Sequence, residues 1–239
     1  MDMRDRYTRY PWIMKQLIRF WTRHISPYLT SLMATIGTVS LAACMVILLG
    51  LGKLFQEVWE KEAFSLDTTL LLRIHQWANP ALDKVMLGLT QLGNPSFIIG
   101  VVIGSLSWLW WKQRRTEAQL FAIACLGALI LNVGLKLFFA KPRPNLWTYL
   151  ITEQSFSFPS GHALGAMVIY GFLAYLLASQ FPKFSRQIYT ATIGLIAAIG
   201  LSRLYLGVHW PTDVLAGYAV GFLWLMTCIT LLKLQAQPR

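Results

Sequence analysis

The sequence predicts an all-α, polytopic membrane protein with six transmembrane helices, and three observations support this fold class. Hydrophobic residues make up 56% of the 239 residues, and the mean hydropathy is +0.51. Charged residues make up 13%, which is about half of the share that a soluble domain carries. The apolar residues are gathered into long runs, so little of the chain is left for a soluble domain.

Six apolar runs account for the predicted spans, because about 20 residues at 1.5 Å each cross a hydrocarbon core of roughly 30 Å. The second of these runs begins earlier, near residue 85, if its first turns lie at the membrane interface. In chain order, the runs cover residues 29–51, 97–111, 119–140, 162–179, 188–206 and 213–232. We therefore expect one membrane domain over residues 29–239, with an outer-face element at about 54–84.

The distribution of basic residues predicts the orientation of these spans. Thirteen of the 21 Lys and Arg residues lie in four segments, at residues 1–28, 112–118, 181–187 and 233–239. Six spans place all four segments on one side, and the positive-inside rule makes that side the cytoplasm. We therefore expect a bacterial-type inner or plasma membrane protein with both termini in the cytoplasm. A nucleic-acid partner would instead require basic residues gathered on one soluble face, so none is expected.

The first 28 residues mix Arg and Lys with aromatic residues such as Trp12 and Trp21. This composition fits a helix that lies in the headgroup region of the bilayer. It fits equally well a basic tail that only sets the topology. Both interpretations remain open from the sequence.

Ionisable residues at the ends of apolar spans are the best candidates for function, because placing them there is costly. Three such groups occur, and the alternation of the spans assigns all of them to the outer face. They are Lys136 with Arg143, the run Pro159-Ser160-Gly161-His162, and Ser202-Arg203 followed by His209 and Asp213. The sequence therefore predicts one site facing the periplasm or the cell exterior.

The chemistry of these residues suits a phosphate group. Lys136, Arg143 and Arg203 would bring three positive charges to the site, and arginine offers paired donors that match phosphate oxygens. Ser160 and Gly161 stand before a predicted helix, where free backbone N–H groups and the helix dipole favour an anion. Glycine also allows an oxyanion to approach the backbone closely. We interpret Lys141, which lies between these residues, as an outer-loop charge.

Two histidines supply candidate catalytic groups. His209 and Asp213 are four residues apart and share a face of a helical turn, so the carboxylate can hold one ring nitrogen and leave the other free to attack. His162 can then protonate the departing alkoxide. Asp213 is already committed to His209, and the cations neutralise charge, so no metal or other cofactor is expected.

The three groups resemble the three signature motifs of the type 2 phosphatidic acid phosphatase family, which is related to the vanadium haloperoxidases. The resemblance covers about Lys136 to Asp213, with Lys136-x6-Arg143-Pro144 as the first motif. Residues 65–95 are similar to the segment between the first two spans in the bacterial integral-membrane lipid phosphatases. The resemblance implies that His209 becomes a phosphohistidine held by Asp213, and that His162 is the acid that later activates water. It also implies that Lys136, Arg143, Ser160, Gly161 and Arg203 bind the phosphoryl oxygens.

We therefore expect a lipid phosphate phosphatase whose substrate stays in the bilayer. The candidate substrates are undecaprenyl diphosphate, phosphatidylglycerophosphate and phosphatidic acid. A lipid phosphotransferase using the same phosphohistidine is the alternative. A non-catalytic transporter or scaffold that binds phosphorylated lipids is disfavoured, because all the motif residues are present.

Two pairs of glycines spaced four apart predict close helix packing. They are Gly161 with Gly165, and Gly217 with Gly221. Such spacing concerns only the approach of helices and carries no information about the substrate.

Overall fold

The computed structural model describes residue 16 and residues 37–60, 64–148 and 150–235. The chain divides after Met45 into two units, and the second unit contains the site described below. The basic, aromatic segment at residues 1–28 lies outside the described residues, except for residue 16. The expectation about that segment therefore stays a prediction.

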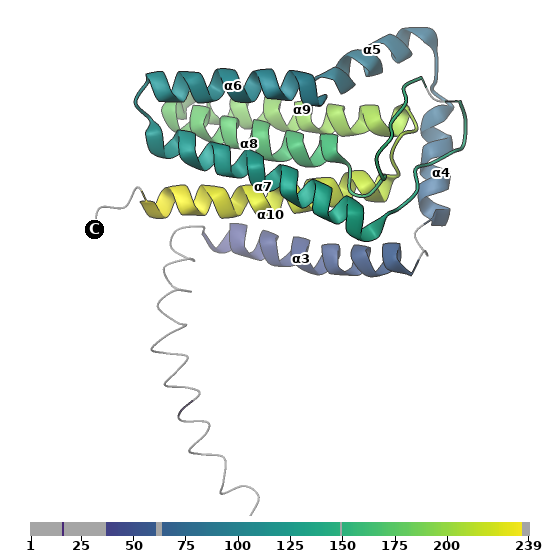
Figure 1. Cartoon of the computed structure of the whole chain (residues 1–239), viewed down its shortest axis with the longest axis horizontal. Helices are drawn as coiled ribbons and strands as arrows, with labels where there is room; N and C mark the ends of the chain where they lie inside the picture. Colours follow the sequence, from purple (N-terminus) through teal and green to yellow (C-terminus); the bar gives the residue numbers. More distant parts are fainter. Residues whose placement is uncertain (1–15, 17–36, 61–63, 149, 236–239) are drawn as a thin grey trace, which may run out of the picture. The chain divides into compact units, whose positions relative to one another are not determined.

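The described part of the chain is all α-helical, as the sequence predicts (Figure 1). The helices α6 to α10 run alongside one another, and α4 is set across one end of them. In chain order, the elements are α3 (Thr38–Trp59), α4 (Phe64–His75), α5 (Pro80–Gln91), α6 (Pro95–Trp111), α7 (Arg115–Phe139), α8 (Gly161–Gln180), the 3-10 turn η3 (Pro182–Phe184), α9 (Ser185–Tyr205) and α10 (Pro211–Gln235).

Within the described ranges, five helices are long and apolar enough to cross a membrane, and a bent pair makes a sixth. The five are α3, α7, α8, α9 with η3, and α10, while α5 and α6 form the pair with a bend of 43°. Asn94 and Pro95 cause this bend. The Asn94 side chain accepts a hydrogen bond from the Ser96 N–H, and Pro95 stands in the first turn of α6, so a new helix begins there.

The first helix extends further than the apolar pattern indicates. The predicted span ends at Leu51, whereas α3 continues to Trp59. Its last turns carry polar residues paired four apart, Lys53 with Glu57 at 3.9 Å and Gln56 with Glu60 at 2.9 Å. Trp59 also stacks on Phe138 of α7, with 5.6 Å between ring centroids. Hydropathy therefore does not mark the end of this helix.

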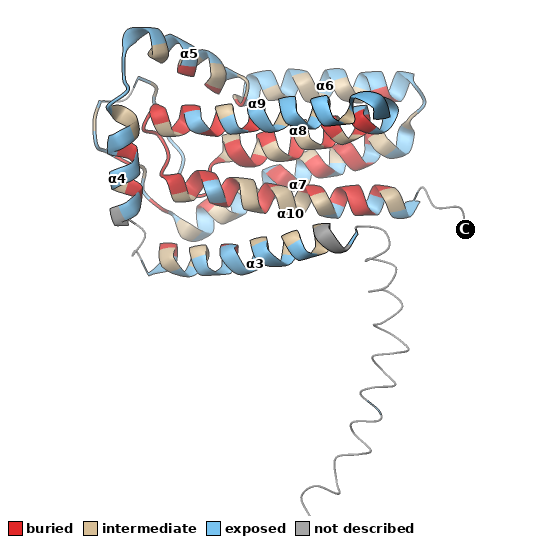
Figure 2. Ribbon diagram, turned by 180° about the vertical axis from the view of Figure 1, so that it is seen from behind, coloured by how far each residue is buried: buried red, intermediate tan, exposed pale blue. Residues whose placement is uncertain are grey.

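The buried core lies between α8 and α10, while α6 and α7 expose many large apolar side chains (Figure 2). One of the two predicted glycine pairs explains how closely these helices approach. A Cβ atom at Gly217 would lie 2.7 Å from the backbone oxygen of Ser160, and one at Gly221 would lie 3.0 Å from that of Leu164. In the other pair, Gly161 lies at a close contact and Gly165 does not, because a Cβ at Gly165 would meet nothing within 4 Å.

Four helix ends meet at one end of this bundle and position the site. There α7 and α9 end and α8 and α10 begin, and α4 packs against α9 and α10 (Figure 1). The described basic residues of the predicted cytoplasmic segments lie at the turns and ends on the opposite side, at Lys112, Arg114, Arg115, Lys183, Arg186 and Lys233. The bundle therefore separates the site from these basic residues.

Candidate active site

The eight predicted site residues all lie at that end of the bundle. Lys136 is in the last turn of α7 and Arg203 in the last turn of α9, while Asp213 is in the first turn of α10. Ser160 precedes α8, which begins with Gly161 and His162. The remaining two residues, Arg143 and His209, lie in the segments that follow α7 and α9.

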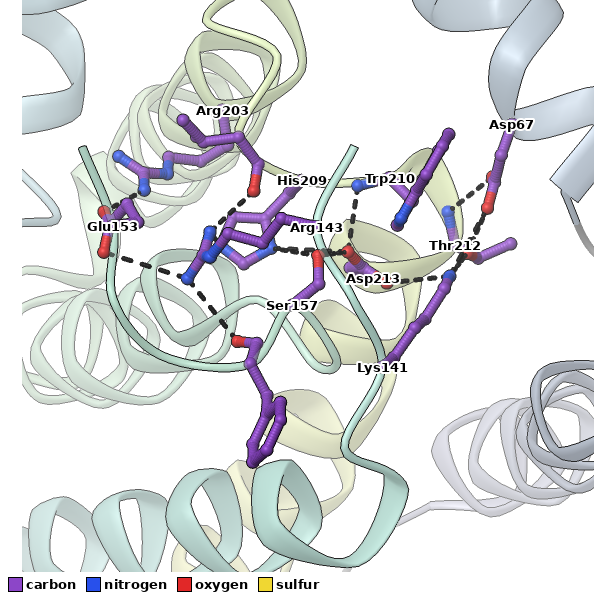
Figure 3. A network of polar contacts seen from close by, with 12 residues as sticks. Asp67, Lys141, Arg143, Glu153, Ser157, Arg203, His209, Trp210, Thr212 and Asp213 are labelled. Carbon is purple, nitrogen blue, oxygen red and sulfur yellow. Dashed lines mark hydrogen bonds and ion pairs between the residues drawn. The ribbon is translucent and has the colours of Figure 1, made fainter. Parts of the chain in front are cut away.

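His209 and Asp213 form the buried centre of the site (Figure 3). The Nδ1 atom of His209 lies 3.4 Å from Oδ2 of Asp213, so the predicted pairing across one helical turn is present. Asp213 Oδ2 also accepts hydrogen bonds from the Trp210 N–H at 2.9 Å and from the Ser157 hydroxyl. On the other side of the ring, Nε2 lies 3.3 Å from Nη1 of Arg143. The imidazole is thus held with one nitrogen on the carboxylate and the other toward the guanidinium.

The surroundings of His209 favour a neutral ring. Burial lowers the pKa of His209 from 6.5 to about 4, because the charged imidazolium loses its hydration. The hydrogen bond and charge of Asp213 oppose this shift, while Arg203 and Arg143 add to it. A neutral imidazole at pH 7 retains a lone pair, which a nucleophile requires.

The two arginines of the site are fixed by many hydrogen bonds. Arg143 donates to the backbone oxygens of Ser155 at 2.8 Å and of Val208 at 2.6 Å. Arg203, only 1% exposed, donates from Nη1 to the Thr90 hydroxyl at 2.7 Å. Its Nε atom is buried and has no hydrogen-bond partner among the described residues. Both guanidinium groups are therefore oriented before any substrate arrives.

Glu153, which the sequence analysis did not identify, joins these two arginines. Its carboxylate forms an ion pair with Nη2 of Arg203 and lies 3.8 Å from Nη2 of Arg143 (Figure 3). Burial raises the pKa of Glu153, but the charges of Arg203 and Arg143 together with the Arg203 hydrogen bond outweigh it and hold that pKa below its ordinary value. An anionic group thus occupies the arginine pair that is predicted to bind phosphoryl oxygens.

Lys136 is turned toward the segment that follows Glu153. Its ammonium donates to the backbone oxygen of Phe156 and to the Ser155 hydroxyl, the latter at 3.4 Å. The lysine is therefore positioned by this segment, next to the arginine pair. Its predicted role in binding phosphoryl oxygens stays a prediction.

The start of α8 differs in detail from the expectation. The Ser160 N–H donates to the backbone oxygen of Asp213 at 2.9 Å, so it is committed to α10, whereas the Ser160 hydroxyl is buried without a partner among the described residues. A Cβ atom at Gly161 would lie 3.0 Å from the side-chain amide of Asn132. Glycine therefore leaves room there for the Asn132 side chain of α7. The Ser160 hydroxyl and the following N–H groups remain as donors.

His162 stands beside the charged residues of the site. Its ring lies against Gly93, where a Cβ atom would be 2.7 Å from Cδ2 of the imidazole. It also lies within electrostatic range of Arg203 and His209. The loop between α5 and α6 therefore supports the face of the second histidine.

Lys141 is not the outer-loop charge that we expected from the sequence. Its side chain is 3% exposed, and its ammonium lies 3.0 Å from Oδ1 of Asp213 and 3.5 Å from Oδ2 of Asp67. The expectation was wrong because nothing in the sequence near Lys141 indicates that α4 and α10 enclose it. Asp67 and Ser157 were missed for the same reason, although the similarity of residues 65–95 to bacterial lipid phosphatases was a signal for Asp67.

Apolar spanning helices that end at a buried histidine–aspartate pair, surrounded by Arg and Lys side chains, define the class of membrane lipid phosphatases. This chain belongs to the PAP2 superfamily, whose sequence profile matches residues 116–236. The resemblance found in the three motifs is thereby confirmed.

Individual relatives agree with this assignment. The chain is 34% identical over 147 residues to phosphatidylglycerophosphatase B of Bacillus subtilis (strain 168), a match covering 60% of this chain and 72% of that protein. It is 32% identical over 165 residues to an undecaprenyl-diphosphatase of Sulfolobus acidocaldarius, covering 66% and 73%. It is also similar to the crystal structure of a transmembrane PAP2-type phosphatidylglycerolphosphate phosphatase from Bacillus subtilis. That similarity has a TM-score of 0.72 and 28% identity, and covers 77% of this chain and 93% of the other.

Proposed function

We propose that this protein removes a phosphate from a lipid phosphomonoester or diphosphate through a phosphohistidine at His209. The substrates we propose are lipids of the undecaprenyl diphosphate, phosphatidylglycerophosphate or phosphatidic acid type. The observation that carries the proposal is the buried His209 ring, held by Asp213 at Nδ1 with its Nε2 directed at Arg143. The activities by which these two relatives are named support the choice of substrates.

In the first proposed step, the lone pair of His209 Nε2 forms a bond to phosphorus. The bond from phosphorus to the lipid oxygen breaks, and protonated His162 gives its proton to that oxygen, so the lipid leaves as an alcohol or as a monophosphate. The Asp213 carboxylate stabilises the positive charge that the imidazole gains. Arg143, Arg203 and Lys136 neutralise the phosphoryl oxygens.

In the second step, water attacks the phosphorus of the phosphohistidine. His162, now neutral, takes a proton from this water, and the N–P bond breaks so that its electron pair returns to Nε2. Inorganic phosphate is released, and His162 is again protonated. One water molecule is consumed over the cycle, and His209 and His162 return to their starting states.

We further propose that the reaction takes place without a metal ion. Both oxygens of Asp213 accept bonds from protein donors: Lys141 at Oδ1, and Ser157 and the Trp210 N–H at Oδ2. These donors compete with a cation for the carboxylate. The arginines and Lys136 supply the positive charge that Mg²⁺ supplies to phosphoryl groups elsewhere. We expect phosphate release to continue in excess EDTA, and restoration by Mg²⁺ of a silenced enzyme would contradict this.

The proposed orientation places the site at the outer face of the membrane, with both termini in the cytoplasm. The described basic residues at the opposite end of the bundle support it through the positive-inside rule. A lipid could then place its headgroup at the helix ends while its chains remain in the bilayer.

The test is phosphate release from the three lipids by the purified full-length protein in detergent. His209→Ala should lower turnover by at least about 10³-fold, because a nucleophile has no substitute. The control His75→Phe changes a histidine that stacks on Trp147 and keeps an aromatic ring there, so turnover should stay within about twofold. Radiolabelled phosphate should remain on the wild-type chain after an alkaline quench. A His209→Ala variant that keeps a tenth of the activity would contradict the proposal.

The same assay distinguishes hydrolysis from transfer. A phosphatase releases inorganic phosphate with water as the only acceptor. A lipid phosphotransferase would turn over only when a lipid alcohol is added, and the phosphate would appear on that lipid. Dependence on an added acceptor would therefore replace hydrolysis with the alternative function.

A further inference from the structure

Asp213 of the histidine–aspartate pair is buried together with two charged side chains, Lys141 and Asp67, to which the three motifs assign no role. Lys141 lies between Asp67 and Asp213, and each of the three side chains is at most 3% exposed (Figure 3). Burying charges is costly unless each one is paired and hydrogen-bonded. This buried charge cluster lies next to His209, the candidate nucleophile, and its position points to a role in the reaction.

Lys141 holds one of the two oxygens of the Asp213 carboxylate. The ammonium donates to Oδ1 of Asp213 at 3.0 Å, while Oδ2 lies 3.4 Å from Nδ1 of His209. The two oxygens thus have different partners, one on each side of the carboxylate. Without Lys141, Oδ1 would lose its charged donor, and the Trp210 N–H and the Ser157 hydroxyl at Oδ2 would be left to hold the carboxylate against the ring.

Asp67 reaches the same place from α4. Its two oxygens accept the Thr212 N–H at 3.0 Å and the Thr212 hydroxyl at 2.6 Å, and the Lys141 ammonium donates to that hydroxyl at 2.8 Å. Thr212 directly precedes Asp213 in the first turn of α10, where N–H groups lack partners within the helix. Asp67 therefore fixes the turn that carries Asp213.

The ionised form of Asp67 depends on these partners. The pKa of the Asp67 carboxyl is raised above its ordinary value, because burial outweighs the Thr212 hydroxyl and the charge of Lys141, which both lower it. Removing the lysine would leave two carboxylates close together without the cation between them. Such a pair resists double ionisation.

The charges of the cluster are matched to a cationic His209. Two carboxylates and one ammonium leave one net negative charge beside the ring, and a neutral imidazole leaves it uncompensated. An imidazole bonded to phosphorus at Nε2 and protonated at Nδ1 carries one positive charge, which balances the cluster. On the opposite side of the ring, the one carboxylate of Glu153 is shared by Arg143 and Arg203, which leaves positive charge there for the phosphoryl oxygens. At Nδ1 the imidazole faces the negative charge of the cluster through Asp213.

We propose that Lys141 and Asp67 are positioning residues for the reaction at His209. Lys141 holds Oδ1 of Asp213 so that Oδ2 stays on the ring, and Asp67 fixes Thr212 and supplies the negative charge that stabilises the cationic imidazole. This inference rests on the proposed phosphohistidine function. It connects α4 to the reacting histidine, although α4 contains none of the motif residues.

The experiment compares variants of the full-length protein with a lipid phosphate that the wild type turns over in detergent. Lys141→Met keeps the length of the side chain and removes its charge, and Lys141→Arg keeps the charge. Lys112→Met makes the same change at the opposite end of the bundle as a control. We expect Lys141→Met to lower kcat by about 10- to 100-fold with KM within about threefold, because partners that orient a functional histidine have effects of this size. Lys141→Arg should keep more than a tenth of the wild-type kcat and should exceed Lys141→Met, and Lys112→Met should change neither constant.

Asp67→Asn, which keeps the shape of the side chain, tests the second residue and covers the case in which Lys141→Met does not fold. It should also lower kcat more than KM. In the double variant with Lys141→Met, the losses should be smaller than the product of the single effects, because both residues act through Asp213.

The outcomes separate this inference from the proposed function. An unchanged kcat in both Lys141→Met and Asp67→Asn, with His209→Ala inactive, would overturn only the positioning role. A rise in KM alone, or losses that multiply in the double variant, would overturn it as well. Activity that survives in His209→Ala would overturn the proposed function.

Discussion

At the scale of single residues, the site is built from opposite charges in contact, and each cation already has an anionic or carbonyl partner. Glu153 lies across Arg143 and Arg203, and Asp213 lies against Lys141. A phosphoryl group that binds to the arginines must therefore compete with the Glu153 carboxylate. The effect of removing the Glu153 charge on anion binding therefore tests whether phosphoryl oxygens bind at these two arginines.

Glu153→Gln should strengthen inhibition by orthovanadate, an anion that adopts the five-coordinate geometry of phosphoryl transfer. Removing the competing charge should lower the inhibition constant by roughly tenfold, equivalent to about 1.4 kcal/mol. Glu117→Gln serves as the control, because Glu117 pairs with Arg114 at the start of α7, far from the site. An inhibition constant that stays the same or rises in Glu153→Gln would show that the carboxylate does not occupy the anion position.

The His209 ring should stay neutral down to about pH 4 in the folded protein. Its folded pKa lies below the unfolded value of 6.5, so protonation favours unfolding. Stability from this group is therefore complete above pH 6.5 and is lost as the pH falls toward 4. Nitrogen-15 NMR of labelled histidine measures this in a variant in which the other three histidines are replaced. A midpoint near 6.5 in the folded state would contradict the prediction, and the urea-unfolded chain provides the reference.

At the scale of elements, the contact between α8 and α10 sets the relative positions of the motif residues. The backbone of Ser160 donates to Asp213, and Gly217 allows α10 to approach the Ser160 backbone oxygen. The second and third motifs are thus held together by main-chain contact. Small changes in the packing of α8 against α10 should therefore alter the rate of phosphate release.

Gly217→Ala should reduce both stability and activity, because its Cβ would lie 2.7 Å from a backbone oxygen that cannot move alone. Overpacking of this kind costs about 1–3 kcal/mol. Gly165→Ala on α8 is the matched control, since a Cβ there meets nothing within 4 Å. Thermal unfolding in detergent and phosphate release measure the two effects. Equal melting temperatures for the two variants would contradict the packing argument.

At the scale of the whole molecule, the second unit separates its charges between two ends. The site end holds paired charges that are mostly buried, and the opposite end holds basic residues such as Lys112 and Lys183 at the helix turns. The positive-inside rule predicts that the second end faces the cytoplasm. The topology can be tested independently of activity.

A cysteine at Asn145, which is exposed beside the site, should react with a membrane-impermeant maleimide in intact cells or spheroplasts. A cysteine at Gln180, exposed at the end of α8 on the opposite side, should react only after the membrane is opened. The background is a variant in which Cys44, Cys125 and Cys228 are replaced by serine. The reverse labelling pattern would place the site at the cytoplasmic face.

The sequence by itself determined the helical membrane fold and the motif residues at the end of the bundle. Long apolar runs have few alternatives to a spanning helix, because unpaired backbone groups are costly in lipid. His209 and Asp213 are four residues apart, so one helical turn is enough to bring them together. Both features depend on residues that are close in sequence, so they can be predicted from a single segment.

Only the tertiary structure decided which other charges complete the site. Asp67 bonds to a residue 145 positions away, and Lys141 pairs with a carboxylate 72 positions away, whereas the local sequence favoured a solvated loop charge for Lys141. Glu153 likewise meets Arg203 across 50 residues. Burial and pairing of these side chains arise where α4, α9, α10 and the segment after α7 pack together. No local sequence pattern predicts these contacts, because the energy of a buried charge depends on partners that distant elements supply.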